Sequence, residues 1–363
     1  RASDIHLEPF ENKLNIRFRV DGVLREVLQY QKNITQMIIS RIKIMSKLDI
    51  SERRLPQDGR ISISVGKRDI DLRVSTLPSS FGERVVLRIL EKDKTQINLD
   101  QLGFNQSILE SFRKNLSKTE GIILVTGPTG SGKTTSLYSG LREISDRSQN
   151  ILTIEDPVEY ALEGIGQTQV NNKTGLTFAK GLRAVLRQDP DIVMVGEIRD
   201  KETAEIAIQA SLTGHLVLST VHTNSAVNAI TRLRDMGIEP YLLSSSLIYV
   251  LSQRLVRRLC EKCKVLDEEI NKTNLLEKHQ LDGEVYKANG CTECDKTGFK
   301  GRLSIGEFVS IDDQVSELIH NSASENEISD YVYKDNNKIF ENGLIALANG
   351  DTSMSELMRV TED

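Results

Sequence analysis

The strongest structural signal in this chain is the sequence Gly121-Ile-Ile-Leu-Val-Thr-Gly-Pro-Thr-Gly-Ser-Gly-Lys-Thr134. An apolar strand pattern leads into a glycine-rich turn that fits G-x-x-x-x-G-K-[ST], and a helical run follows, as a phosphate-binding loop requires. The glycines let backbone N–H groups surround a β-phosphate, and the amino end of the helix adds a favourable dipole. We expect Lys133 to reach the β- and γ-phosphate oxygens and Thr134 to ligate Mg²⁺. The alternative, a glycine-rich turn before an ordinary helix, is disfavoured by the strand context.

After this loop, apolar strands alternate with helical segments. Strands are predicted at 151–154, 192–195 and 216–220, and strands that alternate with helices indicate a mostly parallel sheet covered on both faces. We therefore expect an α/β fold that binds ATP with Mg²⁺. The residues expected to touch the nucleotide are Gly127, Pro128, Thr129, Gly130, Ser131, Gly132, Lys133, Thr134 and Thr135.

The first part of the chain, residues 1–95, follows a different pattern. Between residues 13 and 30 apolar and polar residues alternate around Asp21-Gly22, which predicts a β-hairpin with a two-residue turn. Helical spacing follows at 34–45, and period-two alternation then returns. This region is predicted to be a small α+β domain, and the polar stretch 91–98 is the expected linker.

Hydrolysis of ATP needs a carboxylate that holds the attacking water at the carboxyl end of a neighbouring strand. Ile192-Val-Met-Val-Gly-Glu197 supplies Glu197, with Gly196 where many phosphate-loop enzymes place a magnesium-linked aspartate. We predict that Glu197 is the general base or water orienter. The alternative is a solvated glutamate that caps a helix.

A second acidic cluster, formed by Glu155, Asp156 and Glu159, follows the strand at 151–154. Glu155 is our first choice for a contact to Mg²⁺ through water. A simple turn is the alternative, because Asp-Pro is common in turns.

Two of the five histidines, His215 and His222, flank the strand at 216–220. An imidazole in this position can sense a γ-phosphate in its neutral or charged form. A histidine beside a strand is more often structural, and the functional interpretation is stronger for His222 than for His215.

All four cysteines fall in two Cys-x-x-Cys pairs, Cys260/Cys263 and Cys291/Cys294, in a chain without secretory features. Four thiolates in two such turns are typical of a closed Zn²⁺ site, although the two pairs lie further apart than in the commonest zinc ribbons. The sequence therefore predicts a structural zinc without an open ligand position.

Composition limits the classes of function. The chain has 363 residues, 38% of them hydrophobic, which suits two domains with a small appendage. Its formal charge of −5, from 52 acidic and 47 basic residues, gives no global attraction to nucleic acid. The apolar runs are too short to cross a bilayer, so any membrane contact is expected to be peripheral. Because the first residue is Arg1 rather than Met, we expect further sequence before it.

The motifs together resemble the family of secretion and type IV pilus ATPases. The phosphate loop, TIEDPVEY (153–160), LRQDPDIVMVGEIRD (186–200) and TGHLVLSTVHTNSA (213–226) stand in the order of that family's Walker A, Asp, Walker B and His boxes. The resemblance also covers RASDIHLEP, RLPQDGRI and the cysteine pairs. Within the family, GIGQTQV, QASLTGHLV and RLRDMGIEPYLLSSSL are more similar to the type II secretion ATPases than to the pilus extension or retraction motors.

This resemblance implies a cytoplasmic motor attached peripherally to the inner membrane. It implies a hexamer that binds nucleotide between a small PAS-like amino-terminal domain and a RecA-like domain, and that drives pseudopilus assembly. The implied partners are other copies of the chain and inner-membrane platform proteins of the type II system, not nucleic acid. The segment expected before Arg1 is, in that family, the part that docks on an inner-membrane protein.

Arginines complete such a site, because a guanidinium from a second domain or subunit neutralises the charge that builds on the γ-phosphate. The family's arginines match Arg73 and Arg88, both on strands whose apolar alternation turns these side chains away from the core. Without the resemblance, both would be interpreted as solvated charges at strand edges. Arg183 and Arg187, one helical turn apart, are expected to line the same cleft.

We expect four parts in the chain. Residues 1–95 form the small domain that donates arginines, 96–259 the RecA-like core, 260–305 the tetracysteine zinc subdomain, and 306–363 a helical tail. The basic run 254–264 has the composition of a membrane or nucleic-acid contact. A solvated helix face is the favoured interpretation of that run.

Three alternatives to a type II secretion motor remain at this point. A type IV pilus assembly ATPase would share the same boxes. A RecA-like DNA translocase would need stacking aromatics among basic residues, but aromatics make up 5% of the chain and tryptophan is absent. A zinc-dependent scaffold would bind nucleotide with little turnover, and Glu197 distinguishes it from an enzyme.

Overall fold

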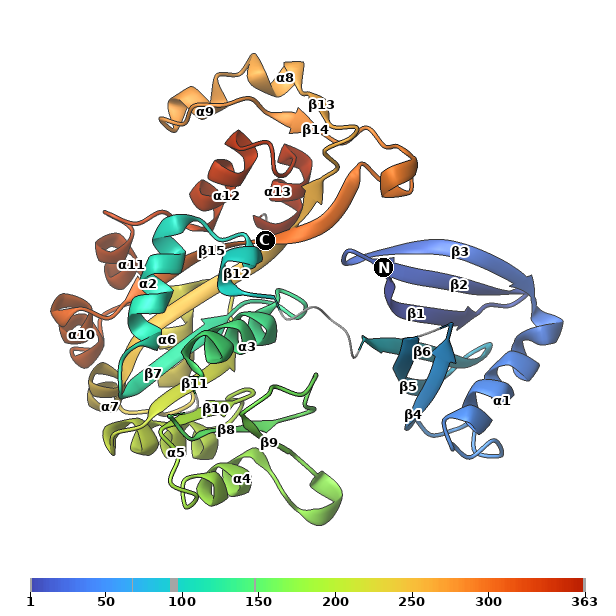
Figure 1. The fold of residues 1–363 in the computed structure, drawn as a ribbon, viewed down its shortest axis with the longest axis horizontal. Coiled ribbons are helices and arrows are strands. Elements are labelled where there is room, and N and C mark those ends of the chain that lie inside the picture. Colours follow the sequence, from blue (N-terminus) through green and yellow to red (C-terminus); the bar gives the residue numbers. More distant parts are fainter. Residues whose placement is uncertain (1, 67, 92–96, 147, 362–363) are drawn as a thin grey trace. The chain divides into compact units, whose positions relative to one another are not determined.

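The computed structural model describes residues 2–66, 68–91, 97–146 and 148–361. It consists of two compact units, Arg1–Thr95 and Gln96–Asp363 (Figure 1). The predicted α/β class with a largely parallel sheet is confirmed. Among the described residues, no helix combines the length and the apolar character that a membrane crossing requires.

The amino-terminal unit is built on an antiparallel sheet whose described strands follow the order β3-β2-β1-β6-β5-β4. The predicted hairpin at Asp21-Gly22 joins β2 to β3, and φ is positive at both residues, 49° and 88°, as a two-residue type I′ turn requires. The strands are β1 (Ala2–Pro9), β2 (Lys13–Val20), β3 (Val23–Gln31), β4 (Gln57–Val65), β5 (Arg68–Ser79) and β6 (Gly82–Glu91).

Helix α1 (Thr35–Met45), entered through the short 3-10 turn η1 (Lys32–Ile34), packs against this sheet. Ile39 of α1 is buried in one apolar cluster with strand residues such as Leu72 and Val74. Side chains alternate between the two faces of a strand, so Arg73, between Leu72 and Val74, lies on the face away from this cluster and is exposed.

The second unit is built on a sheet with the strand order β15-β12-β7-β11-β10-β8-β9. Strands β7 to β12 run parallel to their neighbours, and β15 runs antiparallel to β12. All three strands predicted after the phosphate loop are present. The strands are β7 (Gly121–Thr126), β8 (Ile151–Glu155), β9 (Gly166–Gln169), β10 (Ile192–Val195), β11 (Leu216–Val221), β12 (Leu247–Leu259) and β15 (Phe299–Ser310).

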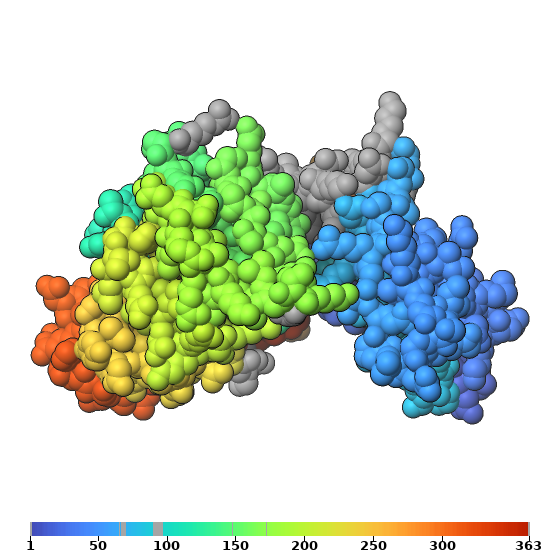
Figure 2. Space-filling model, turned by 90° about the horizontal axis from the view of Figure 1, so that it is seen from below, coloured from blue at the N-terminus to red at the C-terminus, as the bar shows by residue number. Residues whose placement is uncertain are grey.

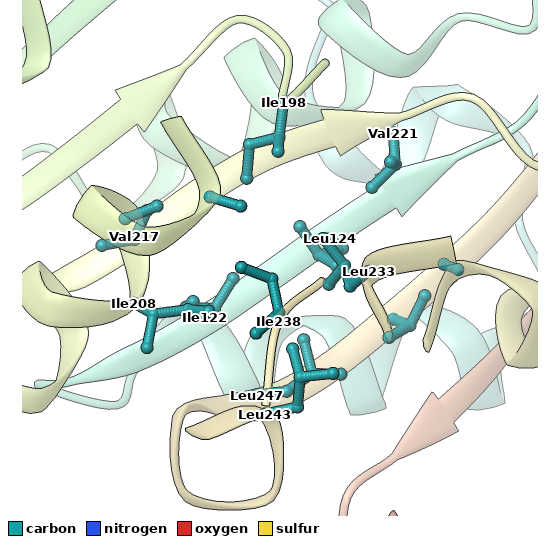
Figure 3. Packing of buried hydrophobic residues seen from close by; sticks show 14 of the residues in the cluster. Ile122, Leu124, Ile198, Ile208, Val217, Val221, Leu233, Ile238, Leu243 and Leu247 are labelled. Carbon is teal, nitrogen blue, oxygen red and sulfur yellow. The ribbon is translucent and has the colours of Figure 1, made fainter. Parts of the chain in front are cut away.

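Helices cover both faces of this sheet, because the central strand β7 is apolar on both sides. Ile122 and Leu124 pack into one cluster together with Ile208 and Leu233 (Figure 3), whereas Ile123 and Val125 pack into the other. Elements coloured green to yellow form much of the face of this unit seen in Figure 2. The helical elements are η2 (Leu99–Leu102), α2 (Gln106–Leu116), α3 (Lys133–Ile144), η3 (Asn172–Thr174), α4 (Phe178–Val185), α5 (Lys201–Leu212), α6 (Ala226–Asp235) and α7 (Pro240–Ser246).

The chain beyond β12 forms a small excursion and then returns to the sheet as β15 (Figure 1). Short amphipathic helices follow, as the tail pattern predicted. The excursion holds β13 (Val265–Leu266), α8 (Glu268–Asn271), α9 (Leu275–Lys278), β14 (Tyr286–Lys287) and η4 (Thr292–Cys294), and the tail holds α10 (Asp313–His320), α11 (Glu325–Val332), α12 (Ile339–Ala348) and α13 (Met354–Thr361).

The interpretation of the basic run 254–264 as a solvated helix face was wrong. Residues up to Leu259 belong to β12, and Arg254 is buried. Arg257 stacks its guanidinium 4.0 Å from the ring centre of Phe299 and pairs with the buried Glu356 at 2.8 Å. Several of these arginines are therefore partnered inside the fold.

Candidate functional site

The phosphate loop lies between β7 and α3, and close packing explains its glycines. Gly127 and Gly132 have φ of 143° and 91°. A Cβ at Gly127 would come within 2.4 Å of the Gln253 carbonyl oxygen, and one at Gly132 within 3.0 Å of the Gln253 Nε2. The loop can take its curve only because both positions lack a side chain.

The donors of the loop suit a phosphate. The loop leads into the amino end of α3, whose first N–H groups lack partners within the helix. The buried hydroxyl of Ser131 has no hydrogen-bond partner among the described residues. Thr134 and Thr135 stand half-buried in the first turn of α3. These groups fit a nucleotide.

The Lys133 side chain is buried beside the loop. Its Nζ donates to the carbonyl oxygens of Gly127 at 2.8 Å and Pro128 at 3.1 Å. Burial lowers the pKa of Lys133 to about 8; the charge of Arg254 acts in the same direction, and Glu197 opposes it. A fraction of the molecules therefore carries Lys133 without its ammonium proton near neutral pH.

Glu197 lies just after β10, and a histidine side chain, His222, lies between it and Lys133. The His222 Nδ1 lies 3.5 Å from the Lys133 Nζ, and its Nε2 lies 3.8 Å from a Glu197 carboxylate oxygen. Arg199 forms an ion pair with the other oxygen of Glu197. Burial lowers the pKa of His222, and the Lys133 charge adds to that shift. A neutral imidazole thus links the loop lysine to a carboxylate paired with arginine.

Glu155, at the end of β8, lies deeper and has different neighbours. Its carboxylate accepts hydrogen bonds from Tyr138, from the Thr153 hydroxyl at 2.5 Å and from the Gln167 amide at 3.1 Å. Burial raises the pKa of Glu155, although these hydrogen bonds oppose the shift. The neighbouring Asp156 and Glu159 are exposed.

The remaining candidates in this unit have partners other than the loop residues. His215 stands at the start of β11, the opposite end from His222, and its Nδ1 lies 2.9 Å from the Ala210 carbonyl oxygen. Arg183 of α4 pairs with Glu202 at 2.8 Å in a solvent-exposed contact. Arg187 donates to the Arg183 carbonyl oxygen at 2.9 Å.

In the amino-terminal unit, the two predicted arginines are direct neighbours across β5 and β6. Arg73 pairs in register with Arg88, and Arg60 of β4 pairs in register with Arg73. Arg88 also donates to Asp4 of β1 at 2.9 Å. Like charges that face each other across strands are destabilising, so this row favours an anion over a bare surface.

The four cysteines converge. The sulfurs of Cys260 and Cys291 lie 3.9 Å apart, and Cys294 lies 3.8 Å from both Cys263 and Cys291. A zinc with four Zn–S bonds of about 2.3 Å requires S–S edges of about 3.8 Å. Backbone N–H groups of Gly290 and Gly298 donate to the sulfurs of Cys263 and Cys294, as thiolate ligands would favour. The donor set fits a structural zinc.

Sequence reasoning overlooked several residues around the loop. Gln253 is fully buried and contacts the phosphate loop. Tyr138 is also fully buried and contacts Glu155. Arg199 pairs with Glu197. The available signal was a single amide among the apolar residues of β12 and a tyrosine on the inner side of α3.

Comparisons with known proteins agree on one family. A family model described as "Type II/IV secretion system protein" matches residues 1–359. The chain is 54% identical to "Type II secretion system ATPase E" of Vibrio cholerae and 56% identical to "Type II secretion system protein E" of Pseudomonas aeruginosa, covering 100% of this chain and 72% of each relative. The crystal structure of the pilus retraction motor PilT with bound ADP shares the fold, with a TM-score of 0.66, 24% identity, and coverage of 100% of this chain and 94% of that one.

Proposed function

This chain belongs to the Type II/IV secretion system protein family and is an ATPase, and we propose that it drives pseudopilus assembly in type II secretion. In this proposal it hydrolyses Mg-ATP in a hexameric ring attached at the cytoplasmic side of inner-membrane platform proteins. The observation that carries the enzymatic part is the contact series from Lys133 through His222 to Glu197 beside the phosphate loop. Relatives named for type II secretion do not favour the pilus assembly or DNA translocase alternatives.

Each residue of the site has a role in this proposal. Backbone N–H groups of the loop hold the β-phosphate, and Lys133 turns from the loop carbonyls to the β- and γ-phosphate oxygens. Thr134 would hold Mg²⁺, which neutralises phosphate charge when bound. Glu197 accepts a proton from, or orients, the attacking water, and His222 senses the γ-phosphate. Glu155 supports the site from the end of β8.

The arginines supply the charge that the loop lacks. We assign to Arg73 and Arg88, with Arg183, the stabilisation of negative charge on the γ-phosphate. A phosphate bound at a site completed by a second domain or subunit would offset the repulsion within this row of facing arginines. The cysteine cluster holds a structural zinc between the ATPase core, residues 96–259, and the tail, residues 306–363.

The test is the ATPase rate per chain as a function of protein concentration, for wild type, Glu197→Gln and Arg73→Ala. Arg41→Ala, an exposed arginine on α1, is the matched control. A rate per chain that rises with concentration, and falls at least tenfold in both variants but not in the control, supports a shared site. A flat concentration dependence with an active Arg73→Ala variant would contradict the ring mechanism.

A further inference from the structure

Strand β12 carries one amide side chain into the interior, at Gln253. Its exposed fraction is 0%, and the preceding residue, Ser252, pairs in register with Thr126 at the end of β7. Gln253 therefore lies beside the point where β7 ends and the phosphate loop begins. A buried amide must find partners for its donors and acceptor, because an unpartnered polar group in the interior is costly.

Both polar atoms of this amide form hydrogen bonds at the proposed nucleotide site. The Nε2 donates to the Ser131 carbonyl oxygen in the loop at 2.6 Å. The Oε1 accepts from the Ser136 hydroxyl in the first turn of α3 at 2.8 Å. A single planar group thus fixes the distance between the loop backbone and the helix that carries Lys133.

The glycines show that the loop is shaped around this residue. The space that a Cβ would need at Gly127 is taken by the main-chain carbonyl oxygen of Gln253, and at Gly132 by its side-chain Nε2. The side chain therefore combines directed hydrogen bonds with close packing against Gly132, while the backbone of β12 packs against Gly127. β12 is itself paired along its length with β15, so its middle is held in place.

We propose that Gln253 is a positioning residue that holds the phosphate loop in its phosphate-binding shape. The inference rests on the nucleotide site proposed above and adds a residue that acts on it through the loop backbone and helix α3. Backbone N–H groups bind phosphate well only when they are already aimed at it, since ordering the loop on binding reduces affinity. Losing Gln253 should therefore weaken nucleotide binding and leave the chemical step nearly intact.

The experiment measures the dissociation constant of a non-hydrolysable ATP analogue, together with KM and kcat, on the full chain. Gln253→Leu keeps the volume but removes both hydrogen bonds, and we expect the dissociation constant and KM to rise about tenfold. We expect kcat to stay within about threefold of wild type. Ser136→Ala removes one of the two hydrogen bonds and should give a smaller rise.

Ser139→Ala is the matched control, because this hydroxyl on the same helix bonds to the Ile97 and Thr135 carbonyl oxygens instead. It should bind the analogue as wild type does. The double variant Gln253→Leu/Ser136→Ala should be no weaker than Gln253→Leu alone, since the two side chains act as one unit.

Two results would overturn the inference. One is unchanged analogue affinity in Gln253→Leu, and the other is an equal loss of affinity in Ser136→Ala and Ser139→Ala. Either result would show that the contact is only structural, and the proposed nucleotide site would still stand as long as wild type binds the analogue. If wild type itself fails to bind the analogue, the proposed nucleotide site fails and Gln253 has nothing to position. A Gln253→Leu chain that does not fold leaves the decision to the Ser136→Ala and Ser139→Ala pair.

Discussion

Two carboxylates, Glu155 and Glu197, follow neighbouring parallel strands, β8 and β10, yet their surroundings differ. Ile154 and Val195 pair in register, so both carboxylates lie at the same edge of the sheet. Glu155 accepts hydrogen bonds from the neutral donors Tyr138, Thr153 and Gln167. Glu197 instead stands beside Arg199 and His222.

This difference separates a carboxylate suited to structure from one suited to chemistry. Deep burial raises the pKa of Glu155 against the opposing effect of its hydrogen bonds, and the neutral donors occupy its lone pairs within the fold. Glu197 pairs with the exposed Arg199 and lies beside the neutral imidazole of His222, an arrangement that suits a carboxylate acting on water. Two carboxylates with such different surroundings can carry out different tasks, although their side chains are alike.

The largest expected effect is on hydrolysis. Glu197→Gln should lower kcat by about 10²–10⁴-fold, because general-base assistance is lost while analogue binding persists. Glu155→Gln should lower kcat by roughly tenfold or less, since its carboxylate has no role in proton transfer in this assignment. Phosphate release under saturating ATP measures both. Equal losses in the two variants would erase the distinction.

The next effect is on the pH dependence of binding. Because Lys133 has a pKa of about 8, the affinity for an ATP analogue should fall by about tenfold per pH unit above pH 8, as the ammonium loses its proton. The Glu197 charge opposes the downward shift of this pKa, so Glu197→Gln should move the fall in affinity to lower pH. Glu155→Gln should leave it in place. Titration of affinity between pH 6 and pH 10 checks this, and an unmoved profile in Glu197→Gln would count against the proximity of the two groups.

Stability should respond in the opposite order. Glu155→Gln places a side-chain amide against the Gln167 amide inside the fold, and we expect the free energy of unfolding to fall by about 1–3 kcal/mol. Tyr138→Phe should cost about 1 kcal/mol through loss of one donor. Glu197→Gln should change it by less than about 1 kcal/mol, because its arginine partner is exposed. Urea unfolding of the three variants decides, and a Glu197→Gln loss larger than the Glu155→Gln loss would reverse the comparison.

The smallest effect concerns protonation of Glu155. Its pKa is raised in the folded chain, so above the ordinary value of 4.5 the folded state keeps a proton that the unfolded state has released. Wild type should therefore lose stability relative to Glu155→Gln as the pH rises from this value to the folded pKa, by at most about 1.4 kcal/mol per unit, and the difference should then level off. Unfolding curves at several pH values measure it. A constant difference would mean that the carboxyl has an ordinary pKa.

The phosphate loop was predictable from sequence because its chemistry is local. Glycines, lysine and the strand before them are contiguous, and the predicted strands β8, β10 and β11 are largely apolar segments. The cysteine cluster was predictable for a similar reason, since each pair is a local turn and thiolates favour one metal geometry.

What escaped prediction depends on contacts between distant parts of the chain. No local pattern places Gln253 beside Ser131, because their contact arises only when β12 inserts next to β7. The basic run was misinterpreted because Arg254, Arg257 and Arg258 have helical spacing, whereas Glu356, far along the chain, pairs with Arg257 on the strand. The pairing of Arg60 with Arg73 likewise follows from strand register.

The strand order has a consequence for synthesis. β7 begins at Gly121, but its neighbours in the sheet, β11 and β12, begin at Leu216 and Leu247. At the usual speed of ribosomes, β7 waits on the order of ten seconds for both neighbours, while the amino-terminal sheet is already complete in sequence. Nascent chains that end before Leu247 thus carry the phosphate loop without the strand that shapes it.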